Sequence, residues 1–205
     1  LGYDIPKTTS RISNLSGVLS WQPEEGKLEL DSQQAVLNMK GYPKQVWTTL
    51  QGIFDWKHIS SGLRLSVEHL LLIQPDMTLT GQGVFDNLSA LGVDNARARV
   101  DFSGKHLEQW LNYLPRKLIK PKLYTWLTRD IKKINSGAGS IQFEGPVNSF
   151  PFDKQDGNFS ITAHASGGEL FINPQWMPIK DIDAYVRLNN RNLEFDLVHA
   201  ELNSV

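Results

Sequence analysis

The chain has five histidines, the residues best suited to metal binding or acid–base chemistry: His58, His69, His106, His164 and His199. No two stand four residues apart, as a pair of ligands on one helix face would, and no HExxH spacing occurs. The chain has no cysteine, which excludes disulfides, thiolate zinc sites and thiol catalysis. We therefore expect neither a metal nor another cofactor.

The sequence motifs of serine nucleophiles and of phosphate-binding loops are also missing. Gly137-Ala138-Gly139-Ser140 lacks the closing glycine of a nucleophile elbow, and no Walker loop or GxGxxG motif occurs. The acid pairs Glu24-Glu25 and Asp181/Asp183 fall in a predicted turn and on the polar side of a predicted strand. We therefore predict that the protein is not an enzyme. One alternative is a hydrolytic or carbohydrate-binding β-protein, which would have exposed tryptophans beside an acid pair.

Residues 115–133 carry seven of the 21 lysines and arginines, close to Tyr124 and Trp126. Cations beside aromatic rings suit an anionic surface such as lipid headgroups. Alternatively, they form the solvated face of an amphipathic helix. The predicted headgroup contacts are Arg116, Lys117, Lys120, Lys122 and Arg129.

Alternation of apolar and polar residues dominates the rest of the chain. It is clearest in residues 63–69, 96–102, 159–163, 182–188 and 193–197. Successive side chains of a strand point to opposite sides, so each strand has one apolar and one polar face. The turn signals between strands are short, which favours antiparallel hairpins. Residues 15–21 resemble residues 50–56, and this weak repeat suggests a sheet that grows by adding similar hairpins.

The period becomes helical after Lys105. Leu107, Trp110, Leu111 and Leu114 follow i, i+3, i+4, i+7 spacing, with Ser103 as the expected N-cap. A second helix is expected to open at Pro121 and to stop at residues 135–137. The predicted organisation is therefore β-strands over 1–104, a two-helix insertion over 105–135, and further strands over 136–205, resuming near Ser140.

The length and charge of the chain bound its partners. A chain of 205 residues with a net charge of −1 is ample for a folded unit but lacks the basic excess of nucleic-acid binders. No apolar run approaches ~18 residues, so no transmembrane span is expected. The first residues hold no initiator Met or signal sequence, and the last follow a strand-like run without a stop. We expect a piece of a longer protein, whose neighbouring segments are partners.

Around the helical break the sequence resembles the AsmA-like envelope proteins of Gram-negative bacteria, most closely their YhdP group. The most distinctive match is Phe150-Pro151-Phe152-Asp153. The other residues that carry the resemblance are Tyr113-Leu114-Pro115, Leu123, Trp126-Leu127, the strand Gly139 to Gly145, Gly167-Gly168, Glu169-Leu170-Phe171, Pro174 to Pro178, and Ile182. Upstream, Leu15-Ser16-Gly17 and Trp21 look like that family's hairpins.

The resemblance implies a periplasmic segment of an inner-membrane-anchored protein that transports phospholipid toward the outer membrane. It also implies a long, curved, taco-like antiparallel sheet with an apolar concave face and no catalytic residues. The strand alternation is consistent with such a groove, in which phospholipid acyl chains contact the apolar strand faces. The predicted groove residues are Leu63, Leu65, Val67, Met77, Leu79, Phe85, Ala98, Val100, Phe102, Phe159, Ile161, Ala163, Ile182, Ala184, Val186, Leu193, Phe195 and Leu197. The alternative is a closed structural or protein-binding β-sandwich without lipid.

Overall fold

The computed structural model describes residues 3–4, 11–38, 44–89, 92–113, 121–172 and 176–202. Almost all of these residues belong to one mainly β structure, in which twelve strands form a single sheet. The strands are β1 (Tyr3–Asp4), β2 (Arg11–Ser13), β3 (Gly17–Trp21), β4 (Glu25–Asn38), β5 (Gln45–Ile59), β6 (Gly62–Gln74), β7 (Met77–Leu88), β8 (Asn95–Lys105), β9 (Ile131–Pro146), β10 (Asn158–Leu170), β11 (Ile179–Asn189) and β12 (Asn192–Leu202).

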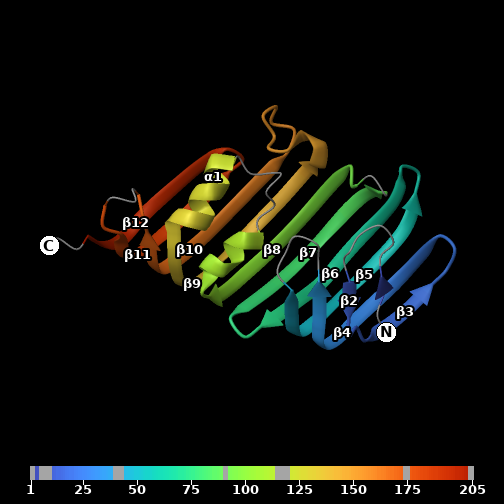
Figure 1. Ribbon diagram of the computed structural model, residues 1–205. Coiled ribbons are helices and arrows are strands. Elements are labelled where there is room, and N and C mark those ends of the chain that lie inside the picture. Colours follow the sequence, from blue (N-terminus) through green and yellow to red (C-terminus); the bar gives the residue numbers. More distant parts are fainter. Residues whose placement is uncertain are drawn as a thin grey trace.

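Strand order follows chain order, and every pairing is antiparallel. The sheet runs β1-β2-β4-β5-β6-β7-β8-β9-β10-β11-β12, while β3 pairs with β4 beside β2. Figure 1 shows this progression from the blue N-terminal strands on one side to the red C-terminal strands on the other. Eleven strands in sequence span about 48 Å at the usual ~4.8 Å spacing. The predicted antiparallel hairpin sheet is thus confirmed, and no second sheet faces it within the described ranges.

The prediction of two α-helices is wrong. Only Pro121–Thr125 (α1) is α-helical among the described residues, and it continues as one wider turn, Trp126–Asp130 (η2). Residues Leu107–Tyr113 form a 3₁₀ helix (η1), and a further 3₁₀ turn, Val147–Ser149 (η3), follows β9. Ser103 is not a cap, because it lies inside β8 and pairs with Ala138.

The expected helical end at residues 135–137 is also wrong, because β9 already begins at Ile131. Gly137 and Gly139 are strand residues whose neighbours come too close for a side chain. A Cβ at residue 139 would lie 2.3 Å from the carbonyl oxygen of Thr162 on β10. For Gly137, which indicated a helix stop in the sequence, the close neighbour is the carbonyl oxygen of His164, 2.7 Å from the position of a Cβ, so close approach of backbones explains this glycine too.

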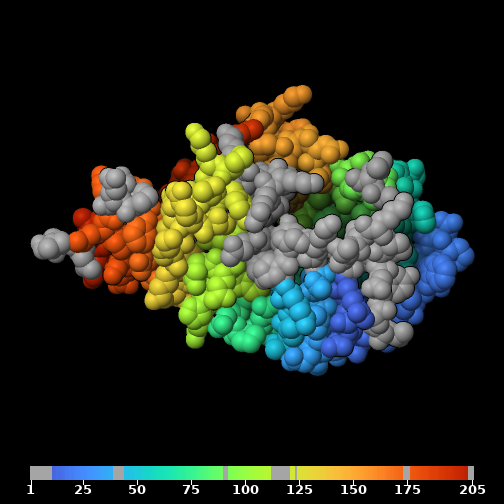
Figure 2. All heavy atoms as spheres, in the orientation of Figure 1, coloured from blue at the N-terminus to red at the C-terminus, as the bar shows by residue number. Residues whose placement is uncertain are grey.

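The η1, α1 and η2 turns, which we call the helical segment, cross one face of the sheet (Figure 1). The space-filling view from the same side shows the yellow part of this segment standing over the strands (Figure 2). None of the helices among the described residues is long and apolar enough to cross a lipid bilayer.

Candidate functional site: an apolar sheet face

Cross-strand register defines two faces of the sheet. Residues directly opposite each other on neighbouring strands project to the same side, so a chain of register partners marks a row on one face. One such row runs unbroken from β6 to β12: Leu70, Gly81, Val100, Ile141, Ile161, Leu188 and Leu193. Every residue in it is apolar or glycine.

The rows on either side of this one are also apolar. The second row is Leu50, Leu72, Leu79, Phe102, Gly139, Ala163, Val186 and Phe195. The third row is Leu19, Leu28, Phe54, Val67, Gly83, Ala98, Phe143 and Phe159. We call the side of the sheet that these three rows occupy the apolar face.

Two outer rows follow the rims of the apolar face. One consists of Trp21, Gly26, Trp56, Leu65, Phe85, Ala96 and Gly145. The other consists of Gln74, Met77, Gly104, Gly137, Ala165, Ala184 and Leu197, and glutamine at its end is the one polar member.

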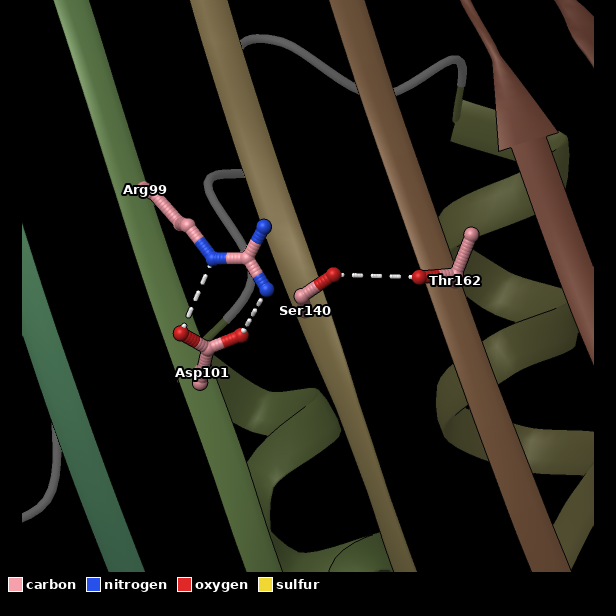
Figure 3. Close-up of polar contacts among 4 residues, drawn as sticks. All are labelled: Arg99, Asp101, Ser140 and Thr162. Carbon is pink, nitrogen blue, oxygen red and sulfur yellow. Dashed lines mark hydrogen bonds and ion pairs between the residues drawn. The ribbon is translucent and has the colours of Figure 1, made fainter.

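The opposite face is mostly polar, with Leu71, Ile73 and Val84 of β6 and β7 as exceptions. The row directly behind the apolar ones is Thr80, Asp101, Ser140, Thr162, Arg187 and Glu194. Figure 3 shows four side chains of this face, in which Arg99 donates to Asp101 (2.7 and 3.0 Å) and the Ser140 and Thr162 hydroxyls lie 3.0 Å apart. The helical turns pass behind the strands in that view, which places the helical segment on the apolar face.

Charges on the polar face are mostly paired. Arg64 binds Asp86, and Arg97 donates to Glu144 at 2.6 Å. The hydrogen bond from Arg64 holds the pKa of the Asp86 carboxyl below its ordinary value, and Arg99 does the same for Asp101. A hollow of about 870 Å³ opens beside the Arg64–Asp86 and Arg97–Glu144 pairs. Its walls offer no free guanidinium to a ligand, because both arginines are already paired.

The register fixes the side of two histidines: His58 is exposed and pairs with Leu63 at the margin of the apolar face, whereas His164 lies on the polar face. His164 Nε2 lies 2.7 Å from Asp183 Oδ1, and Ser166 donates to the other oxygen of that carboxylate, so the pKa of Asp183 is lowered. Because serine and histidine both bind the carboxylate, they do not form a nucleophile–base pair. Asp181, His199 and Glu201 have ligand atoms within 4.8 Å of one another, but all three residues are exposed.

Burial shows that the apolar face is not a closed core. The buried apolar side chains within the described ranges are few: Ala35, Trp47, Met77, Ala96, Leu107, Phe152 and Ala184. Central residues such as Val100, Ile141 and Ile161 are only half-buried. On the edge strand β12, Phe195 and Leu197 are 53% and 64% exposed. A sandwich would have buried these side chains against a second sheet, so the closed-sandwich alternative is not what the described residues form.

The register brings nearly all of the predicted groove residues together on the apolar face. Ile182 is the exception, since its partner Gly168 lies at an irregularity of β10 that leaves its side unassigned. Met77 and Ala184 are buried, Leu193, Phe195 and Leu197 are exposed, and the others are half-buried. Whether they contact lipid remains a prediction.

The predicted headgroup contacts are less well placed. Arg116, Lys117 and Lys120 lie outside the described residues. Lys122 is exposed on α1, while Arg129 forms two hydrogen bonds to Asp130, at 2.6 and 3.0 Å. Of the two described side chains, Arg129 is therefore already engaged in an ion pair.

Sequence reasoning missed a cluster of phenylalanines on the apolar face. Phe143 and Phe159 are register partners, and Phe150 and Phe152 from the loop that follows β9 pack against them with ring centroids 5.2–6.2 Å apart. Phe152 is 2% exposed. Phe150 and Phe152 belong to the most distinctive motif of the resemblance, and the motif itself was the signal that they have a role.

Comparison with known proteins agrees with the resemblance. A family model described as YhdP protein matches residues 3–205, which is nearly the whole chain. No curated protein and no solved structure matches the chain.

Proposed function

The chain belongs to the YhdP family, and from this membership we propose that its apolar face carries the acyl chains of phospholipids between the inner and outer membranes. In this proposal the chain is a periplasmic segment of a longer, inner-membrane-anchored protein of a Gram-negative bacterium. Neighbouring segments of that protein continue the path at the sheet edges. No catalytic residue, metal or cofactor is needed.

The observation that carries the proposal is the set of apolar rows. They cross up to eight strands without a polar side chain at their centre, and they remain half-buried instead of sealed. Each CH₂ group removed from water contributes about 0.8 kcal/mol, so exposing a tail of about fifteen such groups to water costs roughly 12 kcal/mol of free energy. The apolar face restores part of that free energy.

The same rows explain how a lipid could move. Leucine, isoleucine, valine and phenylalanine side chains offer contact without directional bonds, because the hydrophobic effect is non-directional. A tail that slides from Val100 to Ile141 to Ile161 exchanges one apolar neighbour for another. The free energy along the row therefore stays nearly level, and no step has to break a hydrogen bond.

Mass spectrometry of an organic extract tests the proposal on the full-length protein, purified in a detergent that is distinguishable from lipid. We expect phospholipid in amounts comparable to the protein. As a control, the extract of a variant with Val100 and Ile161 replaced by aspartate should contain much less. A wild-type extract without phospholipid above that control contradicts the proposal.

A further inference from the structure

Resting on the proposed function, we infer that β8–β10 form a constriction of the lipid path, where acyl chains pass between two walls. The apolar face is walled at both rims here, and its open floor is the short stretch that contains Gly139, Ile141, Ile161 and Ala163. The structure supplies three observations for this inference: a wall of η1, a wall of phenylalanines, and the distance between them.

The first wall is η1. Leu107 is buried between Gly104 of β8 and Gly137 of β9, and a Cβ at residue 137 would lie 2.8 Å from its Cδ1. The backbone N–H of Ile134 donates to Glu108 Oε2 (2.8 Å), and that of His106 donates to the carbonyl of Asn135 (3.1 Å). These bonds fix η1 over this rim of the apolar face.

The second wall is the loop that joins β9 to β10, residues 147–157. It places Phe150 and Phe152 over Phe143 and Phe159 at the opposite rim. Asp153 of the same loop accepts a bidentate pair of hydrogen bonds from Arg191 in the β11–β12 turn, one of them 2.7 Å long. The loop is therefore held by a neighbouring hairpin as well as by its own phenylalanines.

The two walls meet the same strand six residues apart. On β9 the η1 wall stands at Gly137 and the phenylalanine wall at Phe143, a separation of about 20 Å at ~3.3 Å per residue. Contact distances of about 4 Å from each wall leave roughly 12 Å between the axes of the outermost tails, so about four tails spaced ~4 Å apart fit side by side. The walls therefore limit the path here to a few acyl chains abreast.

The surface between the two walls lies close to the sheet backbone because several of its residues have small side chains. Gly139 and Ala163 are register partners in the second row, and Ala98 lies in the third row on β8. Small side chains let a tail lie close to the backbone, so the path gains depth where the walls reduce its width. Outside this stretch, β12 carries its apolar residues exposed. The narrowing therefore ends before β12, whereas in the other direction η1 extends toward β5, where the rings of Trp110 and Trp47 lie 5.9 Å apart.

A cysteine at residue 163 tests the constriction, because the bulky group is attached by alkylation only after the protein has folded. In the full-length protein, freed of any other accessible cysteine, Ala163→Cys is alkylated with benzylmaleimide. Photocrosslinkers at Val67 and Phe195, on either side of β8–β10, then report lipid. Thr162→Cys, whose side chain lies on the polar face, is the matched control. Ala163→Phe is a second variant that needs no reagent.

We expect alkylation at residue 163 to abolish lipid crosslinking at one of the two flanking positions, and alkylation at residue 162 to leave both unchanged. Lipid crosslinking at both positions after residue 163 is alkylated would overturn the constriction while the proposed function stands. Absence of lipid crosslinking in the unmodified protein would instead overturn the proposed function, and the constriction with it.

Discussion

Leu107 occupies the space that Gly137 leaves by having no side chain. Across the sheet the carbonyl of His164 is equally close, at 2.7 Å from the position of a Cβ on residue 137. The glycine therefore serves two contacts at once: the seat of η1 on the apolar face and the close pairing of β9 with β10.

Replacing Gly137 with alanine should destabilise the protein by about 1–3 kcal/mol, the usual cost of forcing extra atoms into a packed site. Because Leu107 must shift, Trp110, which lies 5.9 Å from Trp47, should report the change by its fluorescence. Urea unfolding measures the loss of free energy. Ala138→Val adds atoms to the exposed neighbour on the polar face, and its unfolding free energy should stay within about 0.5 kcal/mol of the wild type.

Phe152→Ala should cost about 3–5 kcal/mol, as expected for truncating a buried phenylalanine. Its ring fills the space over Gly145 and Gly157, where a Cβ on residue 157 would lie 2.3 Å from Cε1. Phe195→Ala, on the exposed edge strand, is the control and should cost less than about 1 kcal/mol. Equal unfolding free energies for the two variants would contradict the role of Phe152 as a wall.

The Arg64–Asp86 pair should give stability that depends on pH. Because Arg64 lowers the pKa of Asp86 in the folded state, the pair stabilises the protein above the ordinary pKa of the carboxyl. That contribution is lost as pH falls through the lowered value. The difference in unfolding free energy between wild type and Asp86→Asn should therefore shrink from pH 6 toward acid. In an Arg64→Gln background, Asp86→Asn should show no such trend.

Charge on the apolar face should block the proposed path, since an unpaired carboxylate is costly beside hydrocarbon. Ile141→Asp in the full-length protein should abolish lipid crosslinking at one of the positions that flank β8–β10. Because Ile141 is half-buried, the variant is expected to fold, as thermal unfolding will show. Gln142→Asp, one residue away on the polar face, is the matched control. Loss of crosslinking in both variants would contradict this prediction, because it would show that any added carboxylate disrupts β9, whichever face it lies on.

Much of the sheet could be predicted from the sequence because the polar and apolar residues alternate so regularly. Leu63, Leu65 and Val67 alternate with polar residues, and the register places these three on one face. The alternation fails at the next residues, since Leu70 to Ile73 form a continuous apolar run. A bulge beside His69, whose φ is +51°, shifts the phase there, so Leu70 and Leu72 join the apolar rows.

The walls could not be predicted, because they depend on contacts between distant residues. Helical spacing at Leu107, Trp110 and Leu111 indicated a helix, yet the structure has a 3₁₀ turn docked on glycines of β8 and β9. Gly137 indicated a helix stop, yet it is a strand residue that lies against Leu107 and the backbone of β10. Phe150 and Phe152 stood out only through the family motif, and the residues they cover lie on β9 and β10.

A photocrosslinker placed in turn at two adjacent residues of β9 tests the central claim most directly. Ile141 lies in the first apolar row, and Gln142 lies on the polar face as the register partner of Arg99 and Ser160. In the full-length protein, in cells with radiolabelled phospholipid, the account predicts strong lipid capture at residue 141 and background capture at residue 142. Equal capture at both residues, or capture at residue 142 alone, would contradict it.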